Sequence, residues 1–105
     1  MESNSYMEKF SEIINGNTPV LVDFFAEWCG PCKAMKPVLD EVKRKLGDKV
    51  RIIKIDVDKN NALSQTLDIR SVPTLILYRN GKILWRTSGA RPLNELIEAV
   101  ERNSL

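Results

Sequence analysis

Hydrophobic residues follow two different periodicities along the chain, and together they predict alternating strands and helices. Residues 19–25 are almost continuously apolar, which is typical of a central strand buried on both faces. Asn80 and Gly81 predict a tight hairpin turn, because both positions of such a turn take positive φ. We expect four strands, at residues 19–25, 50–55, 74–78 and 83–87.

Apolar residues at helical spacing predict four helices around these strands. Ser5 is a candidate N-cap for the first helix, which we expect to end near Gly16. The second helix contains Pro37, which is expected to kink it, and ends at Gly47. Asp58 is a candidate N-cap for the third helix. The expected buried positions are Met7, Phe10, Ile13 and Ile14; Met35, Val38, Leu39, Val42 and Leu46; Ala62, Leu63 and Leu67; and, after Pro92, Leu93, Leu96, Ile97 and Val100.

The order of these elements describes an α/β protein. The first strand, helix and second strand are expected to form a parallel unit with a right-handed crossover. The hairpin adds an antiparallel pair, so we expect a central mixed sheet of four to five strands with helices on both faces. The 105 residues predict a single domain over residues 1–105.

Composition and charge exclude several classes of protein. The net charge is only +2, and the one basic run, residues 43–45, is expected to be the solvated face of a helix, so we expect no nucleic-acid partner. Histidine is absent, which excludes His-based acid–base catalysis. No stretch reaches the length of a membrane span, and the polar residues 1–6 do not resemble a signal peptide. We therefore expect a cytoplasmic protein away from membranes, with a monomer as the simplest state.

Cys29 and Cys32 are the only cysteines, and their spacing at a strand-to-helix junction is the strongest chemical signal in the chain. Two cysteines without histidine are too few for a zinc site or an iron–sulfur cluster, and Lys33 stands where haem attachment needs histidine. A structural disulfide closing so small a loop stabilises a fold by only about 2 kcal/mol. The pair therefore favours redox chemistry, and we expect no metal.

The junction also assigns a role to each cysteine. Cys29 is expected at the exposed start of the helix, where backbone N–H groups stabilise a thiolate, and is the predicted nucleophile. Cys32, three residues on, is expected to resolve the mixed disulfide. Gly30 and Pro31 between them carry no charge, so we expect them to tune the pair towards reduction.

Residues 22–24 (Val-Asp-Phe) and 26–33 (Ala-Glu-Trp-Cys-Gly-Pro-Cys-Lys) resemble the active-site segment of the thioredoxin family. The resemblance covers about residues 18–102 and implies the thioredoxin fold. It also implies a general cytosolic protein disulfide reductase, recharged by a thioredoxin reductase that draws on NADPH. The chain has no Gly-x-Gly-x-x-Gly loop, so we expect no bound nicotinamide or flavin and no cofactor beyond the Cys29–Cys32 disulfide. The other matching positions are Pro37, residues 54–56, residues 72–74, Asn80-Gly81 and residues 88–90.

The sequence departs from the family pattern in two places. Phe25 stands where many thioredoxins carry a second tryptophan, so the packing beside the cysteines is expected to differ slightly. Residues 1–6 lack the apolar character of the family's first strand, so we expect that edge strand to be missing or vestigial.

Asp23 lies within an apolar strand, where a buried carboxylate is costly. The residues alone leave two interpretations open: a carboxylate facing water at a strand end, or a functional one. The resemblance favours the second, in which Asp23 has a raised pKa and accepts the proton of Cys32. Lys54 is either a lysine that extends to the surface or a charge that modulates Asp23.

The resemblance further implies a cis Val72–Pro73 bond packed against the cysteines. Val72 would then offer its backbone to an extended substrate segment. The apolar surface expected around Cys29 consists of Trp28, Gly30, Pro31, Pro73, Gly89 and Ala90; Trp28 in the core is the alternative. Two other functions remain open, a disulfide oxidase or isomerase, and a binding module that needs no thiols.

Overall fold

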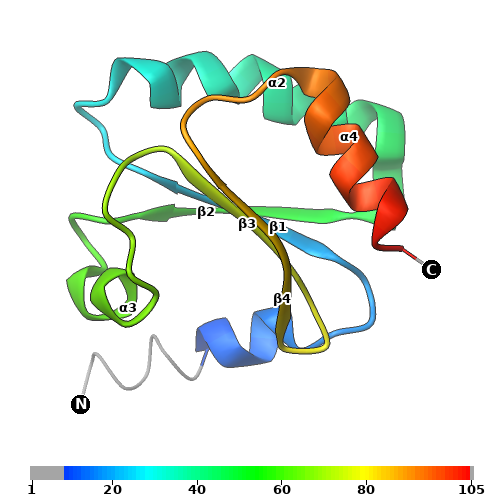
Figure 1. The fold of residues 1–105 in the computed structure, drawn as a ribbon, viewed down its shortest axis with the longest axis horizontal. Helices are drawn as coiled ribbons and strands as arrows, with labels where there is room; N and C mark the ends of the chain where they lie inside the picture. Colours follow the sequence, from blue (N-terminus) through cyan, green and yellow to red (C-terminus); the bar gives the residue numbers. More distant parts are fainter. Residues whose placement is uncertain (1–8, 105) are drawn as a thin grey trace.

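The computed structural model describes residues 9–104 and contains a four-stranded mixed sheet in the order β2-β1-β3-β4 (Figure 1). The β1–β2 pair is parallel, and the β1–β3 and β3–β4 pairs are antiparallel. Residues 9–14 are helical. The other elements are β1 (Val20–Phe25), α2 (Gly30–Leu46), a 3-10 turn (Gly47–Lys49), β2 (Arg51–Asp56), α3 (Asn61–Thr66), β3 (Thr74–Arg79), β4 (Lys82–Ser88) and α4 (Leu93–Arg102).

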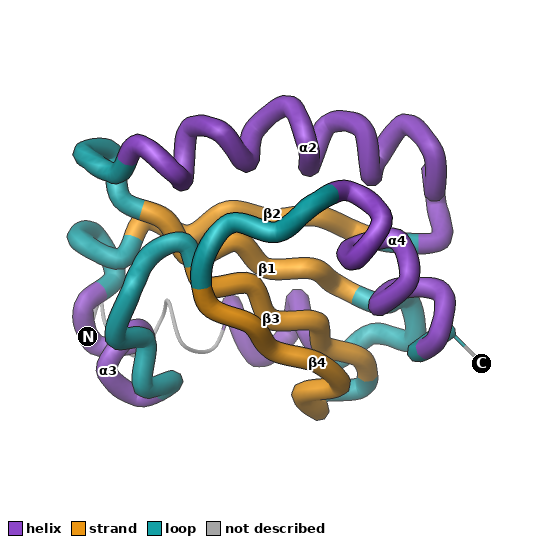
Figure 2. Tube along the Cα trace, turned by 45° about the horizontal axis from the view of Figure 1, so that its top comes forward, coloured by secondary structure: helices purple, strands orange, loops and turns teal. Residues whose placement is uncertain are grey.

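The sheet is covered on both faces, as the hydrophobic pattern predicts. α2 and α4 lie on one face, and α3 and the helix of residues 9–14 lie on the other (Figures 1 and 2). Alternate residues of β1 therefore enter different cores. Leu21 packs with α2 and α4, whereas Val22 and Phe24 pack with the opposite layer. Asp23, two residues after Leu21, lies on the α2 face.

The turns and caps account for the ends of the main elements. Asn80 and Gly81 have φ of 53° and 78°, which confirms the predicted hairpin turn. Gly47 has φ of 53° at the end of α2, and its backbone N–H donates to the Lys43 carbonyl, which satisfies one of the last carbonyls of this helix. Pro37 lies within α2, and the helix continues on both sides of it.

Two predictions about the third helix are wrong. Asn60, and not Asp58, occupies the N-cap position of α3, because this helix begins only at Asn61. Ala62 is exposed, and Ser64 is buried in its place. The Ser64 hydroxyl donates to the carbonyl of Asn60 at 2.8 Å, which satisfies its hydrogen-bonding need.

Three sequence predictions fall outside the described residues: the Ser5 cap, the burial of Met7 and the missing edge strand at residues 1–6. In the described part of the chain, no helix is both long and apolar enough to cross a membrane.

Candidate active site

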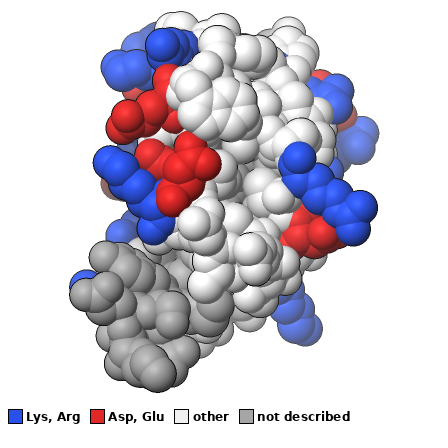
Figure 3. Space-filling model, turned by 90° about the vertical axis from the view of Figure 1, so that its left-hand side faces the viewer, with Lys and Arg blue, Asp and Glu red and all other residues white. Residues whose placement is uncertain are grey.

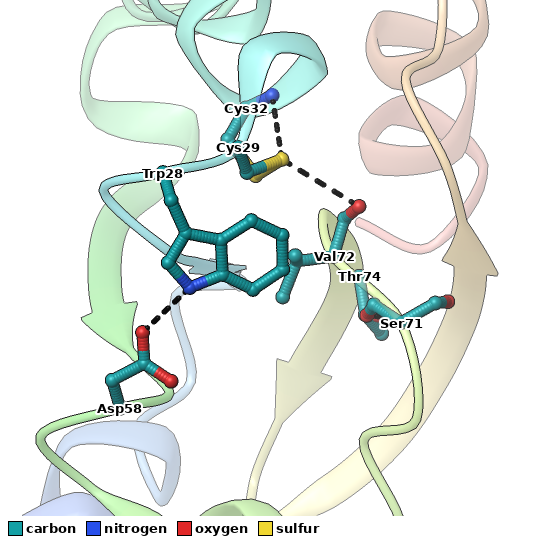
Figure 4. Close-up of a disulfide and its surroundings, with 7 residues drawn as sticks. All are labelled: Trp28, Cys29, Cys32, Asp58, Ser71, Val72 and Thr74. Atoms are coloured by element: carbon teal, nitrogen blue, oxygen red, sulfur yellow. Dashed lines mark hydrogen bonds between the residues drawn. A yellow bond between two sulfur atoms is a disulfide. The ribbon is translucent and has the colours of Figure 1, made fainter.

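A disulfide joins Cys29 to Cys32 where the chain passes from β1 into α2, with the two Cα atoms 5.3 Å apart (Figure 4). Cys29 is the N-cap of α2. Its Sγ accepts the backbone N–H of Cys32 at 3.1 Å. An N–H group directed at this sulfur, together with the helix dipole, stabilises negative charge on Cys29 in the reduced protein. The geometry therefore suits Cys29 to be the thiolate.

The Cys29 sulfur also lies 3.7 Å from the Val72 carbonyl oxygen, at the start of the loop-to-strand junction before β3. The Val72–Pro73 peptide is cis, as the family resemblance implies. One sequence prediction about Cys29 is wrong. Its residue exposure is 4%, against 5% for Cys32, so it is not the exposed member of the pair. The two cysteines are buried together because Ala26, Val57 and Val72 pack around them.

Trp28 is 72% exposed, so the alternative that it belongs to the core is wrong. Its indole Nε1 donates to the Asp58 carboxylate at 2.8 Å (Figure 4). A second link between the same two loops is the ion pair of Glu27 and Lys59 at 3.7 Å. Asp58 is a site residue that the sequence analysis missed, since the contact joins positions 30 residues apart and leaves no periodic signal.

An uncharged surface surrounds the disulfide. Viewed from the end where α2 begins, it forms a pale area with charged side chains along both margins (Figure 3). Pro73 is an exception to the prediction, because it is buried beneath this surface, and its carbonyl accepts the Gly89 N–H at 2.8 Å. We use the name docking surface for the exposed or half-buried members, namely Trp28, Gly30, Pro31, Val72, Gly89 and Ala90.

Asp23 is completely buried, so the alternative of a carboxylate facing water is wrong. Neither of its carboxylate oxygens has a hydrogen-bond partner in the described part of the chain. Burial raises the pKa of Asp23 from 3.8 to about 6, and the Lys54 charge opposes part of that rise. Asp23 and Cys32 line the same pocket of about 310 Å³. The structure thus brings the predicted proton acceptor to the inner side of the resolving cysteine.

Lys54 lies directly opposite Asp23 in the β1–β2 register and lines the same pocket. Its side chain is exposed, as the surface interpretation predicts. Its charge nevertheless lowers the pKa of Asp23, which is the effect that the second interpretation requires. Among residues 9–104, no cluster of three or more His, Cys, Asp or Glu residues could hold a metal ion.

Comparison with known proteins identifies this arrangement. The thioredoxin family model matches residues 3–102. The chain is 46% identical over 93 residues to the chloroplastic thioredoxin Y of rice, covering 88% of this chain and 55% of the rice protein. It therefore spans just over half the length of that relative. It is 38% identical to thioredoxin of Rickettsia prowazekii, with 89% of each chain covered.

Solved structures agree with these sequence relatives. A mutant thioredoxin of Halobacterium salinarum superposes with a TM-score of 0.84 at 32% identity, covering 93% of this chain and 85% of that one. Mitochondrial thioredoxin 3 of Saccharomyces cerevisiae, in its oxidised form, gives 0.83 at 31% identity, covering 91% and 89%. The observed sheet and flanking helices are thus the thioredoxin fold. With the Cys29–Cys32 disulfide at the start of α2, the chain belongs to the thioredoxin family.

Proposed function

We propose that the protein is a general protein disulfide reductase in which Cys29 attacks and Cys32 resolves. The observation that carries this proposal is the position of the Cys29 sulfur, which accepts the Cys32 N–H and lies 3.7 Å from the Val72 carbonyl. A nucleophile is thereby placed beside a backbone that can pair with any extended segment. The uncharged docking surface around it suits many different substrates.

In the first step, the Cys29 thiolate attacks one sulfur of a substrate disulfide. A bond forms between Cys29 and that sulfur, and the other substrate sulfur leaves as a thiolate. Val72 supports the approach of the substrate by pairing with its backbone. Gly30 and Pro31 add no charge beside the sulfurs, which favours a reducing pair over an oxidising one.

In the second step, Cys32 gives its proton to Asp23 and attacks Cys29 Sγ. The mixed disulfide breaks, the second substrate sulfur leaves, and the Cys29–Cys32 disulfide forms again. Because the pKa of Asp23 is about 6, the group is mostly a carboxylate at neutral pH, and it is a stronger base than an ordinary aspartate. The pocket shared by Asp23 and Cys32 is the proposed route of the proton.

The oxidised protein must be recharged, and we propose that a thioredoxin reductase supplies the two electrons from NADPH. We further propose that a single-domain monomer works in the cytoplasm, because a reductase needs a reducing compartment. The chloroplastic rice relative makes the chloroplast the competing location. Fractionation of the source cells with an antibody to the protein decides between them, and NADPH consumption with added thioredoxin reductase tests the recharging step.

The equilibrium redox potential of the Cys29–Cys32 pair tests the direction of the reaction. Equilibration against dithiothreitol is expected to give a value close to the roughly −270 mV of thioredoxin itself. The reduced protein is also expected to reduce a disulfide-bonded protein substrate in a single turnover. A potential near the roughly −120 mV of a strong periplasmic oxidant would instead identify an oxidase and overturn the proposal.

A further inference from the structure

Charged residues border the docking surface, and most of them are paired with one another. Glu27 pairs with Lys59 at 3.7 Å on the Trp28 side. Asp68 pairs with Arg70 at 2.8 Å in the loop before β3. Such pairs leave little net charge for an approaching substrate. The bordering residues that have no oppositely charged partner therefore decide what the surface attracts.

Arg91 is such a residue. It directly follows Ala90 of the docking surface and is half-buried. Its Nη2 donates to the Ser88 carbonyl at 3.0 Å, which anchors one edge of the guanidinium. Its Nε is buried without a hydrogen-bond partner, and no described acidic side chain forms an ion pair with Arg91. The resting position of this side chain thus leaves both its charge and one donor unsatisfied.

The backbone places Arg91 beside the proposed path of the substrate. The Gly89 N–H donates to the Pro73 carbonyl at 2.8 Å, so residues 89–91 run next to the Val72–Pro73 junction. The Val72 carbonyl of the same junction lies 3.7 Å from the Cys29 sulfur.

From this arrangement we propose that Arg91 selects substrate disulfides that carry an aspartate or glutamate within about three residues of the attacked cysteine. The proposal rests on the reductase function proposed above. A substrate carboxylate would receive the Nε and Nη edge of the guanidinium after a turn of the side chain, which satisfies the donor that now lacks a partner. The carboxylate is not consumed. Two electrons and two protons pass from the protein dithiol to the substrate disulfide as before.

The test uses peptides closed by their own disulfide, in which a single glutamate is placed at each of three positions on either side of the attacked cysteine. Matched peptides carry glutamine at the same positions. We expect the reduced wild-type protein to react faster with at least one glutamate peptide than with its glutamine counterpart, by about two- to fivefold. The difference is expected in the apparent KM, and to shrink as salt is added.

Arg91→Gln is expected to abolish the preference, and Arg91→Glu to reverse it. Arg51→Gln is the matched control, because it removes the same charge at the end of β2 away from the cysteines and is expected to keep the preference. Arg91→Lys keeps the charge but lacks the planar guanidinium, so it is expected to keep part of the preference for glutamate. It provides a second variant if Arg91→Gln does not fold. Equal rates for every peptide pair would overturn the inference while the reductase function stands. Failure to reduce any peptide would overturn the reductase function itself.

Discussion

The two sides of the Cys29–Cys32 disulfide are lined by different kinds of chemical group. The outer side offers a backbone carbonyl, an exposed indole and small uncharged residues. The inner side offers a single carboxylate, Asp23, buried without a hydrogen-bond partner in the described structure. Shape and backbone pairing accept many substrates, whereas proton transfer needs one group at one place. The comparison teaches that substrate binding and proton transfer are assigned to separate groups on opposite sides of one sulfur pair.

The two sides also differ in their cost to the fold. An exposed indole with a satisfied N–H costs little. A buried carboxylate without partners costs a great deal, and the rise in the pKa of Asp23 records that cost. This contrast suggests which substitutions break the function without harming the fold.

The largest expected effect comes from exchanging one cysteine at a time. Cys29→Ser removes the nucleophile, so we expect no reduction of any disulfide and no covalent adduct. Cys32→Ser leaves attack intact and removes resolution, so we expect the mixed disulfide to accumulate. Mass spectrometry after mixing with a disulfide peptide measures both results. An adduct on Cys32 in the Cys29→Ser protein would show that the two sides have been assigned the wrong way round.

Asp23→Asn removes the proposed proton acceptor on the inner side and leaves the outer side unchanged. We expect resolution of the mixed disulfide to slow about a hundredfold at neutral pH, the low end of general acid–base catalysis, while its formation is unchanged. In the wild type, the resolution rate is expected to rise as pH increases through about 6, as Asp23 ionises, and the variant should lose this step. Rapid mixing at several pH values follows the two phases separately. Equal resolution rates in the two proteins would remove Asp23 from the mechanism.

The same substitution is expected to stabilise the protein. The folded-state pKa of Asp23 lies above its unfolded value, so the unfolded chain binds fewer protons between pH 3.8 and about 6, and stability falls as pH rises through that window. The rise in pKa corresponds to about 3 kcal/mol above pH 6, because each factor of ten is worth about 1.4 kcal/mol. Asp23→Asn should gain up to that amount at neutral pH and almost nothing below pH 4. Urea unfolding at both pH values measures the gain, and an equal gain at both would contradict it.

The fold could be predicted largely from local signals. A few neighbouring residues were enough to predict the apolar strand β1, the helix α2 and the Asn80-Gly81 turn. The buried face of the short α3 was harder to predict, because it includes a serine, Ser64, whose hydroxyl donates to the Asn60 carbonyl. The pattern placed the buried pair at residues 62 and 63, and the structure places it one residue later, at 63 and 64, so Ser64 is buried and Ala62 is not.

The site was predictable only in part. The position of Cys29 at the start of α2 follows from the chain order, but its burial does not. That burial depends on Val57 and Val72, which come from distant loops. The contact of Trp28 with Asp58 has the same origin. Contacts between loops leave no periodic signal, so the sequence indicated the chemistry of the cysteines better than their surroundings.

Trp28→Ala removes the exposed indole of the outer side, and we expect a smaller effect than those of the cysteine and Asp23 variants. Loss of the exposed indole should raise the KM for a disulfide-bonded protein about tenfold, as expected when an anchoring aromatic is truncated. The reduction rate of a small aromatic disulfide should change little, because that substrate needs no docking surface. Ile83→Ala is the matched control, since Ile83 is also a large exposed apolar residue, 50% exposed, on β4. A similar loss with both substrates would place Trp28 on the chemical side of the comparison.

The smallest expected effect separates Lys54 from the other lysines near the inner pocket. The Lys54 charge lowers the pKa of Asp23, so Lys54→Met should move that pKa further above about 6. The pH midpoint of the resolution step should then rise, by less than about one unit, because an exposed lysine is screened by water. Lys36→Met is the control, since Lys36 lines the same pocket but pairs with Asp40 and does not contribute to the shift of Asp23. Equal midpoints in the two variants would show that the charge opposite Asp23 in the sheet has no special influence, and that burial alone sets the strength of the inner base.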